Sequence, residues 1–263
     1  DHNFARLANP SQAAFALTVG SVCISKFDDA NYTSFGDLNE PSAFTRQGSG
    51  LWGMVKPDVV EYGGDYVKEK NNNPVLVTTR EETSPETVRS TLNGGPAFGR
   101  DQPGTSFSTP KVSHVIAHIL NNWPNVTSLF IRTLLVQSAR WPNIKLQLSP
   151  FQKLKAFGYG IPSISKALDN SPGRITFVAE NSVQPKKANV YKIEIPEELR
   201  KQTDSYSFLI EVTLSYKSRI RRTRQVTKSY ISSWTDWISS KIGESDENFK
   251  NRVIKNAGIS ILY

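Results

Sequence analysis

The chain of 263 residues has one cysteine, and this scarcity limits the classes of protein it can belong to. A single thiol, Cys23, allows no internal disulfide, which excludes a small disulfide-stapled fold and favours a reducing, cytoplasmic compartment. Because Cys23 lies in the apolar run 16–24, we expect a buried structural thiol there and not a nucleophile. No run approaches the roughly 18 apolar residues that cross a bilayer, so we expect no membrane partner.

Positive charge is in excess, and much of it is concentrated in one segment. The formal net charge is +8 at pH 7, and residues 217–228 are crowded with lysine and arginine. Such a cluster can contact phosphates, but no aromatic residues alternate with these cations, and the segment lies between predicted strands. We therefore expect a solvated hairpin or a surface for an acidic partner, and no nucleic-acid partner.

The first two thirds of the chain carry patterns of buried strands and helices. Residues 15–24 form an apolar, β-branched run typical of a strand buried in a parallel sheet, and residues 75–79 predict another short strand. Helical spacing of apolar residues predicts a mostly buried helix over 106–120. A second helix is predicted from Thr127, a capping residue, to near Ala139, and a short capped helix over 163–168.

The pattern changes after the turn at residues 169–173. Alternation of apolar and polar residues predicts half-exposed antiparallel strands at 174–178, 190–195 and 207–216, and residues 248–257 predict a helix. We expect Trp234 and Trp237 to contribute to the core of this part and not to a ligand platform. The sequence thus predicts an α/β domain over residues 1–172, followed over residues 173–263 by a small β-rich domain with helices.

One segment, residues 104–110 (Gly-Thr-Ser-Phe-Ser-Thr-Pro), has the features of a reactive site. Ser106 starts an apolar helix directly after a glycine turn, where free backbone N–H groups and the positive end of the helix dipole would stabilise an oxyanion. Gly104 would let the backbone approach a substrate, and Pro110 lies where a missing N–H costs little. A serine that only caps a buried helix explains the same pattern more simply, so these residues alone leave both interpretations open.

This segment resembles the nucleophile motif of the subtilases, G-T-S-x-[AS]-[TS]-P, a family of subtilisin-like serine proteases. Further segments resemble other motifs of that family in the family's order: residues 9–21 (P-[AS]-x6-AVGA), 42–48 (A-x-F-S-x-x-G), 56–63 (K-P-D-V-x-A-P-G) and 158–168 (G-x-G…A-L). The resemblance covers residues 9–169. It implies the C-terminal half of a subtilisin-like parallel-sheet domain, within an enzyme that hydrolyses peptide bonds of a polypeptide substrate.

The resemblance also implies roles for individual residues. Ser106 would be the catalytic nucleophile and its N–H an oxyanion donor, and the supporting motif residues would be Gly104, Thr105, Thr109 and Pro110. No cofactor is implied; structural calcium occurs in the family, but no residues here indicate it. Residues 221–241 resemble the tails of intracellular bacterial subtilases.

Several positions depart from the family pattern. Lys111 and His114 replace the histidine and glycine of P-H-V-A-G, so packing around the helix must differ, and Glu61-Tyr62 replace Ala-Pro. His114 and His118 have a spacing that can hold zinc, but no carboxylate or cysteine completes such a site. We therefore expect ordinary helix histidines and no metal.

The family uses an aspartate, a histidine and a serine in that chain order. Neither a D-[ST]-G nor an H-G-[TH] segment occurs in this sequence, and Asn3 lacks the glycine that precedes the family's oxyanion asparagine. Without a base, the Ser106 hydroxyl has nothing to take its proton. We expect a fragment that is inactive alone and whose partner is the N-terminal half of the catalytic domain. The alternative is a catalytically dead scaffold derived from a protease, with the basic segment 217–228 as a patch for an anionic partner.

Overall fold

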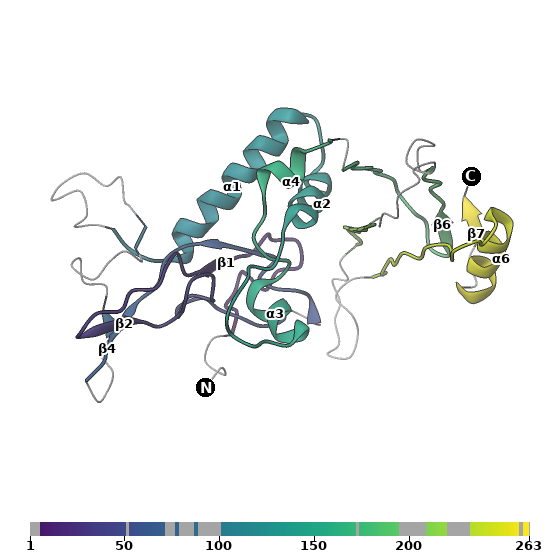
Figure 1. The fold of residues 1–263 in the computed structure, drawn as a ribbon. Coiled ribbons are helices and arrows are strands. Elements are labelled where there is room, and N and C mark those ends of the chain that lie inside the picture. The colour runs from purple at the N-terminus through teal and green to yellow at the C-terminus, as the bar shows by residue number, and fades with distance from the viewer. Residues whose placement is uncertain are drawn as a thin grey trace, which may run out of the picture. The chain divides into compact units, whose positions relative to one another are not determined.

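The chain divides into two units in the computed structural model, Asp1–Ile175 and Thr176–Tyr263. The structure describes residues 6–50, 53–71, 77–78, 87–88, 101–171, 174–194, 209–219, 232–257 and 260–262. Most of the described helices and strands belong to the first unit (Figure 1). The separate roles expected for residues 1–172 and 173–263 stay a prediction.

A parallel strand pair lies at the centre of the first unit. Strand β1 (Val19–Val22) pairs with β3 (Val59–Tyr62), with Val19 opposite Val59. This confirms the parallel strand expected within 15–24, although it is shorter than the apolar run. It begins only at Val19 because the preceding amide, that of Thr18, donates to the Asp58 carboxylate at 2.8 Å.

Helices cover both faces of this strand pair, as expected for an α/β fold. Consecutive residues of a strand point to opposite faces, so Val59 and Val60 enter different cores. Val59 packs in a cluster with residues of α1 (Thr105–Asn122), α2 (Ser128–Ser138) and α4 (Ile164–Leu168). Val60 packs with residues of α3 (Pro150–Phe157). Figure 1 shows α1, α2 and α4 grouped together and α3 on the other side of β1.

Both long helices predicted from the sequence are present. α1 buries the stripe Ser108, Val112, Val115 and Ile119 against the strands, and α2 is capped by Thr127, whose hydroxyl accepts from the Phe130 amide at 3.2 Å. The expectation that α1 is mostly buried needs correction, because its opposite face, which carries Ser106 and His114, is exposed. The short helix α4 has the predicted cap, Ser163.

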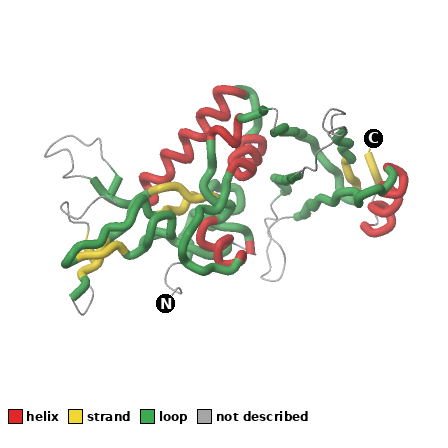
Figure 2. Tube along the Cα trace, in the orientation of Figure 1, coloured by secondary structure: helices red, strands yellow, loops and turns green. Residues whose placement is uncertain are grey.

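Outside this layer, a small antiparallel sheet has the strand order β2 (Tyr32–Ser34), β4 (Val67–Glu69) and β5 (Val77–Thr78) (Figure 2). β5 falls within the strand predicted at 75–79, the rest of which lies outside the described residues. None of the described helices is long and apolar enough to cross a membrane.

The second unit contains the helix predicted at 248–257, but its strands differ from the prediction. Its described strands are β6 (Lys187–Asn189) and β7 (Ser260–Leu262), which pair in parallel, and its helix is α6 (Asp246–Ala257). The described parts of the predicted strands, 174–178, 190–194 and 209–216, form no strands. Trp234 and Trp237 are 77% and 50% exposed, so they are not core residues. Alternation produces a strand only beside a partner strand, and no described partner lies beside these segments.

Candidate active site

The candidate nucleophile lies where α1 is fastened to the end of β3. Gly104 is the N-cap of α1, and its amide donates to the carbonyl of Gly63 at 2.8 Å. The Phe107 amide then donates to the Gly104 carbonyl at 3.0 Å, which closes the turn. A Cβ on Gly63 would meet Ser21 Oγ, Ser108 Oγ and Gly104 O more closely than real Cβ atoms approach. This join therefore requires glycine at position 63.

The helix then separates two nearby serines. Ser106 is exposed, and its hydroxyl makes no hydrogen bond to any residue that the structure describes. Ser108 is fully buried, and its Oγ has no hydrogen-bond partner among the described residues. Residues two apart on a helix point in different directions, so the turn presents Ser106 to the solvent and directs Ser108 inward. Of the two hydroxyls, only that of Ser106 is accessible to a substrate.

The amino end of α1 is electrostatically open. No side chain caps the helix, and no acidic residue lies in its first turn. The first amides of a helix have no intrahelical partner, and together with the helix dipole they favour a negative charge. Two other motif residues do not cap these amides: the Thr109 hydroxyl donates to the Thr105 carbonyl at 2.9 Å, and Pro110 has no side-chain acceptor. The geometry at Ser106 is thus suited to a negatively charged oxygen.

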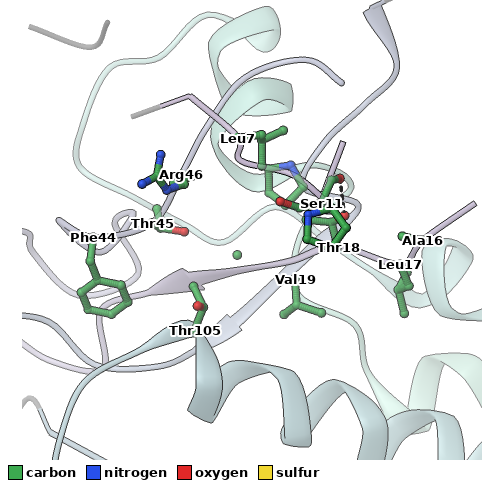
Figure 3. Close-up of a pocket in the computed structure, with 13 residues that line it drawn as sticks. Leu7, Ser11, Ala16, Leu17, Thr18, Val19, Phe44, Thr45, Arg46 and Thr105 are labelled. Atoms are coloured by element: carbon green, nitrogen blue, oxygen red, sulfur yellow. Dashed lines mark hydrogen bonds between the residues drawn. The ribbon is translucent and has the colours of Figure 1, made fainter. Parts of the chain in front are cut away.

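A cavity of about 390 Å³ borders this turn (Figure 3). It follows the chain along residues 16–20 and reaches Thr105, the residue before Ser106. The labelled side chains in Figure 3 come from the segment before β1, from β1 itself, from the turn at residues 44–46 and from α1. Its lining is mostly uncharged, with Arg46 at one side.

Behind the turn, a lysine ties α1 to β3. Lys111 Nζ donates to the Tyr62 carbonyl at 2.8 Å and lies 5.9 Å from the centroid of the Tyr62 ring. Burial raises the pKa of Glu61, an effect opposed by a hydrogen bond from the Tyr62 amide and by the charge of Lys111. Tyr62 is itself held by a 2.8 Å hydrogen bond from its hydroxyl to Asn39 Oδ1. The substitutions that depart from the family pattern at 61–62 and 111 therefore meet in space, which sequence reasoning did not anticipate.

A buried ionic group also stabilises the packing of β1 and β3 against α2. Asp58 accepts from Lys56 Nζ at 2.6 Å and from the Arg132 guanidinium, and both Lys56 and Asp58 are 1% exposed. Lys56 also donates to the Ala16 carbonyl at 2.5 Å. Burial lowers the pKa of Lys56, and the Asp58 charge partly offsets that effect. This group joins β1, β3 and α2 and has no contact with Ser106, so we assign it a structural role.

No described residue supplies a base to Ser106. His114 and His118 follow it on the same helix by 8 and 12 residues, which is roughly 12 and 18 Å along the axis. Asn3 and the cations Arg221, Arg222, Arg224 and Lys228 lie outside the described residues. Cys23 is fully buried, as expected, and its thiol contacts Asp65 Oδ2 at 3.3 Å. In the part of the chain that the structure covers, no group of three or more His, Cys, Asp or Glu side chains could hold a metal ion.

Comparison with known proteins places these residues in a family context. Residues 1–160 match the model of the family described as "Subtilase family". The uncharacterized protein y4bN of Sinorhizobium fredii is 32% identical over 234 residues, which cover 83% of this chain and 52% of the relative. The chain therefore spans about half the length of this relative.

Proposed function

We propose, because this chain belongs to the subtilase family, that it supplies the nucleophile-bearing part of a serine endopeptidase. One observation carries the proposal: Ser106 is exposed at an uncapped helix amino end, within a segment that matches the nucleophile motif of the family. Burial of this hydroxyl, or a cap on the helix, would have argued against it. The substrate class is a polypeptide, because the family hydrolyses peptide bonds.

In the proposed mechanism, Ser106 Oγ attacks the carbonyl carbon of the scissile bond while a histidine takes its proton. The carbonyl oxygen becomes an oxyanion, and the Ser106 N–H at the positive end of α1 is one of its donors. The histidine returns the proton to the leaving amine, and water then hydrolyses the acyl-enzyme. This chain provides the nucleophile and that donor, whereas the general base and the aspartate that orients it belong to the rest of the protein.

The other motif residues have supporting roles in this proposal. Gly104 holds the turn through its amide and presents no side chain toward a substrate. The space beside it is open, because a Cβ there would meet nothing nearer than 3.6 Å. The Thr109 hydroxyl donates a hydrogen bond to the Thr105 carbonyl, and Pro110 has no N–H that would compete for a backbone carbonyl. Thr105 forms part of the cavity wall and would lie beside a bound polypeptide.

The partner of this chain in the proposal is the N-terminal half of the catalytic domain. Among the described residues, β3 is the strand that pairs with β1, and residues 40–45 bond to the other edge of β1 at its carboxyl end, where the Ser42 amide donates to the Ser21 carbonyl at 3.0 Å. The beginning of β1 borders the cavity along residues 16–20, and a strand of a parallel sheet needs coverage there as well. We place the upstream strands, with the histidine and the aspartate, on this side. The chain alone is then inactive.

Labelling of the intact protein by a serine-directed phosphonate tests the proposal. We expect labelling of the intact protein that is lost in Ser106→Ala. Ser113→Ala is the matched control, because Ser113 is an exposed serine of the same helix whose hydroxyl donates to the Thr109 carbonyl. Labelling that survives Ser106→Ala would refute the nucleophile. An intact protein that takes no label and cleaves no polypeptide would instead support the catalytically dead scaffold.

A further inference from the structure

The exposed face of α1 carries two histidines whose ring nitrogens converge. His114 Nε2 and His118 Nε2 are 3.2 Å apart, and the two rings meet edge to face with centroids 4.6 Å apart. Their spacing of four residues places both side chains on one face of the helix. His114 is exposed and His118 is half-buried, so solvent reaches the pair.

From this geometry we propose that His114 and His118 form a two-ligand site for a divalent transition-metal ion. Imidazole nitrogens bind zinc at about 2.0–2.1 Å, so two nitrogens on one ion are about 2.9–3.4 Å apart for angles between about 90° and the tetrahedral angle. The observed 3.2 Å lies within that range. The ion therefore needs no rearrangement of α1 to reach both nitrogens.

The neighbouring polar side chains do not oppose a cation at the histidine pair. At 3.2 Å the two ring nitrogens can share a hydrogen bond, and an ion held between them would replace the shared proton. The closest lysine on the helix, Lys111, directs its ammonium to the Tyr62 carbonyl and does not compete with a bound cation. Asn122 donates to the His118 carbonyl at 2.9 Å, which holds the last turns of the helix. Once the shared proton is displaced, each imidazole offers one nitrogen to the ion.

The ligand set defines the class of ion. Imidazole suits zinc, copper and nickel, whereas magnesium and calcium require oxygen ligands. No third His, Cys, Asp or Glu joins the pair among the described residues, so water or a ligand from outside this chain completes the coordination. Affinity should follow the general order for divalent ions, with Cu²⁺ the tightest. This site lies two to three turns from Ser106 and does not depend on the proposed protease activity.

Titration of the purified chain, prepared without a histidine tag, tests the proposal. The chain has three histidines, so a His2→Ala background removes the one outside the proposed site. In that background we expect one Cu²⁺ per chain by calorimetry, two nitrogen ligands by electron paramagnetic resonance, and weaker binding of Zn²⁺. Mg²⁺ should not bind.

Substitution of either ligand should weaken Cu²⁺ binding at least ~10-fold, since even the loss of an outer partner of a metal ligand costs about that much. His114→Ala and His118→Ala are the test variants, and alanine is well tolerated on an exposed helix face, which circular dichroism verifies. Asn121→Ala, an exposed residue of the next turn, is the matched control and should bind as the background does. Binding that survives the double substitution, or no binding in the His2→Ala background, would overturn the site.

Discussion

Lys111 donates a hydrogen bond to the carbonyl of Tyr62, and the next carbonyl of the chain, that of Gly63, accepts the Gly104 amide. The two distances are both 2.8 Å, so consecutive carbonyls at the end of β3 hold the first two turns of α1. One bond comes from a side chain and the other from the backbone. The position of Ser106 therefore depends on a charged group five residues after it in the helix.

Lys111→Met should destabilise the first unit by about 1–2 kcal/mol, because the Tyr62 carbonyl loses a charge-assisted hydrogen bond in a half-buried place. Lys111→Arg keeps the charge and the reach, and should recover most of that loss. Urea unfolding of the three proteins measures the difference in the free energy of unfolding. Equal destabilisation by methionine and arginine would show that shape, and not the charge, matters at this position.

The carboxyl of Glu61, at the contact between β3 and α1, makes the stability of the first unit depend on pH. Burial raises the pKa of Glu61 above its ordinary value of 4.5, so the folded chain binds a proton more readily than the unfolded chain. The contribution of Glu61 to stability is therefore greatest at low pH and is lost as the pH rises from about 4.5 through the raised pKa of the folded state.

Glu61→Gln should remove this dependence, because a neutral amide can still accept the hydrogen bond that the Tyr62 amide gives to the Glu61 carboxylate. Burial also raises the pKa of Asp65, which both proteins share, so the informative quantity is the difference between their free energies of unfolding. The variant should gain stability relative to the parent as the pH rises from about 4 to 8. A difference that is constant over this range would contradict the assignment.

Much of the first unit could be predicted, because its elements are specified by local patterns. The stripe at Val112, Val115 and Ile119 and the cap at Thr127 are properties of short windows, and the structure contains both helices. Helix α3 was missed although Ser149 and Gln152 form a capping box there and Pro150 begins the helix. Attention to that cap would have found it.

The second unit was less predictable, because strands depend on partners that a local pattern does not contain. Residues 209–216 alternate as a strand does, but the structure gives their described part no neighbouring strand. The same limit applies to the site. The sequence identified Ser106 and the departures at Glu61 and Lys111 separately, but a contact between residues about 50 positions apart follows only from the fold.

The buried carboxylate of Asp58 should be among the most sensitive positions in the chain. Asp58→Ala leaves the Lys56 ammonium buried without its anion, and loss of one partner of a buried pair costs about 3–5 kcal/mol. Asp37→Ala is the matched control, because Asp37 pairs with two exposed lysines, Lys145 at 3.0 Å and Lys26 at 3.7 Å, and its loss should cost much less than that of Asp58. Urea unfolding compares the two variants, and similar losses would show that the Lys56–Asp58 pair is not the structural anchor we describe.

Two glycines at the Ser106 turn should respond in opposite ways to alanine. Gly63→Ala places a methyl group against Ser21 Oγ, Ser108 Oγ and the Gly104 carbonyl, so we expect severe destabilisation or no folded protein. Gly104 has an extended backbone with φ 164°, and a Cβ there meets nothing nearer than 3.6 Å, so Gly104→Ala should fold with a melting temperature close to that of the parent. In the intact protein, however, the added methyl group would point toward the bound polypeptide and reduce phosphonate labelling of Ser106. A Gly104→Ala protein that labels as fast as the parent would show that the substrate does not approach the backbone at this turn.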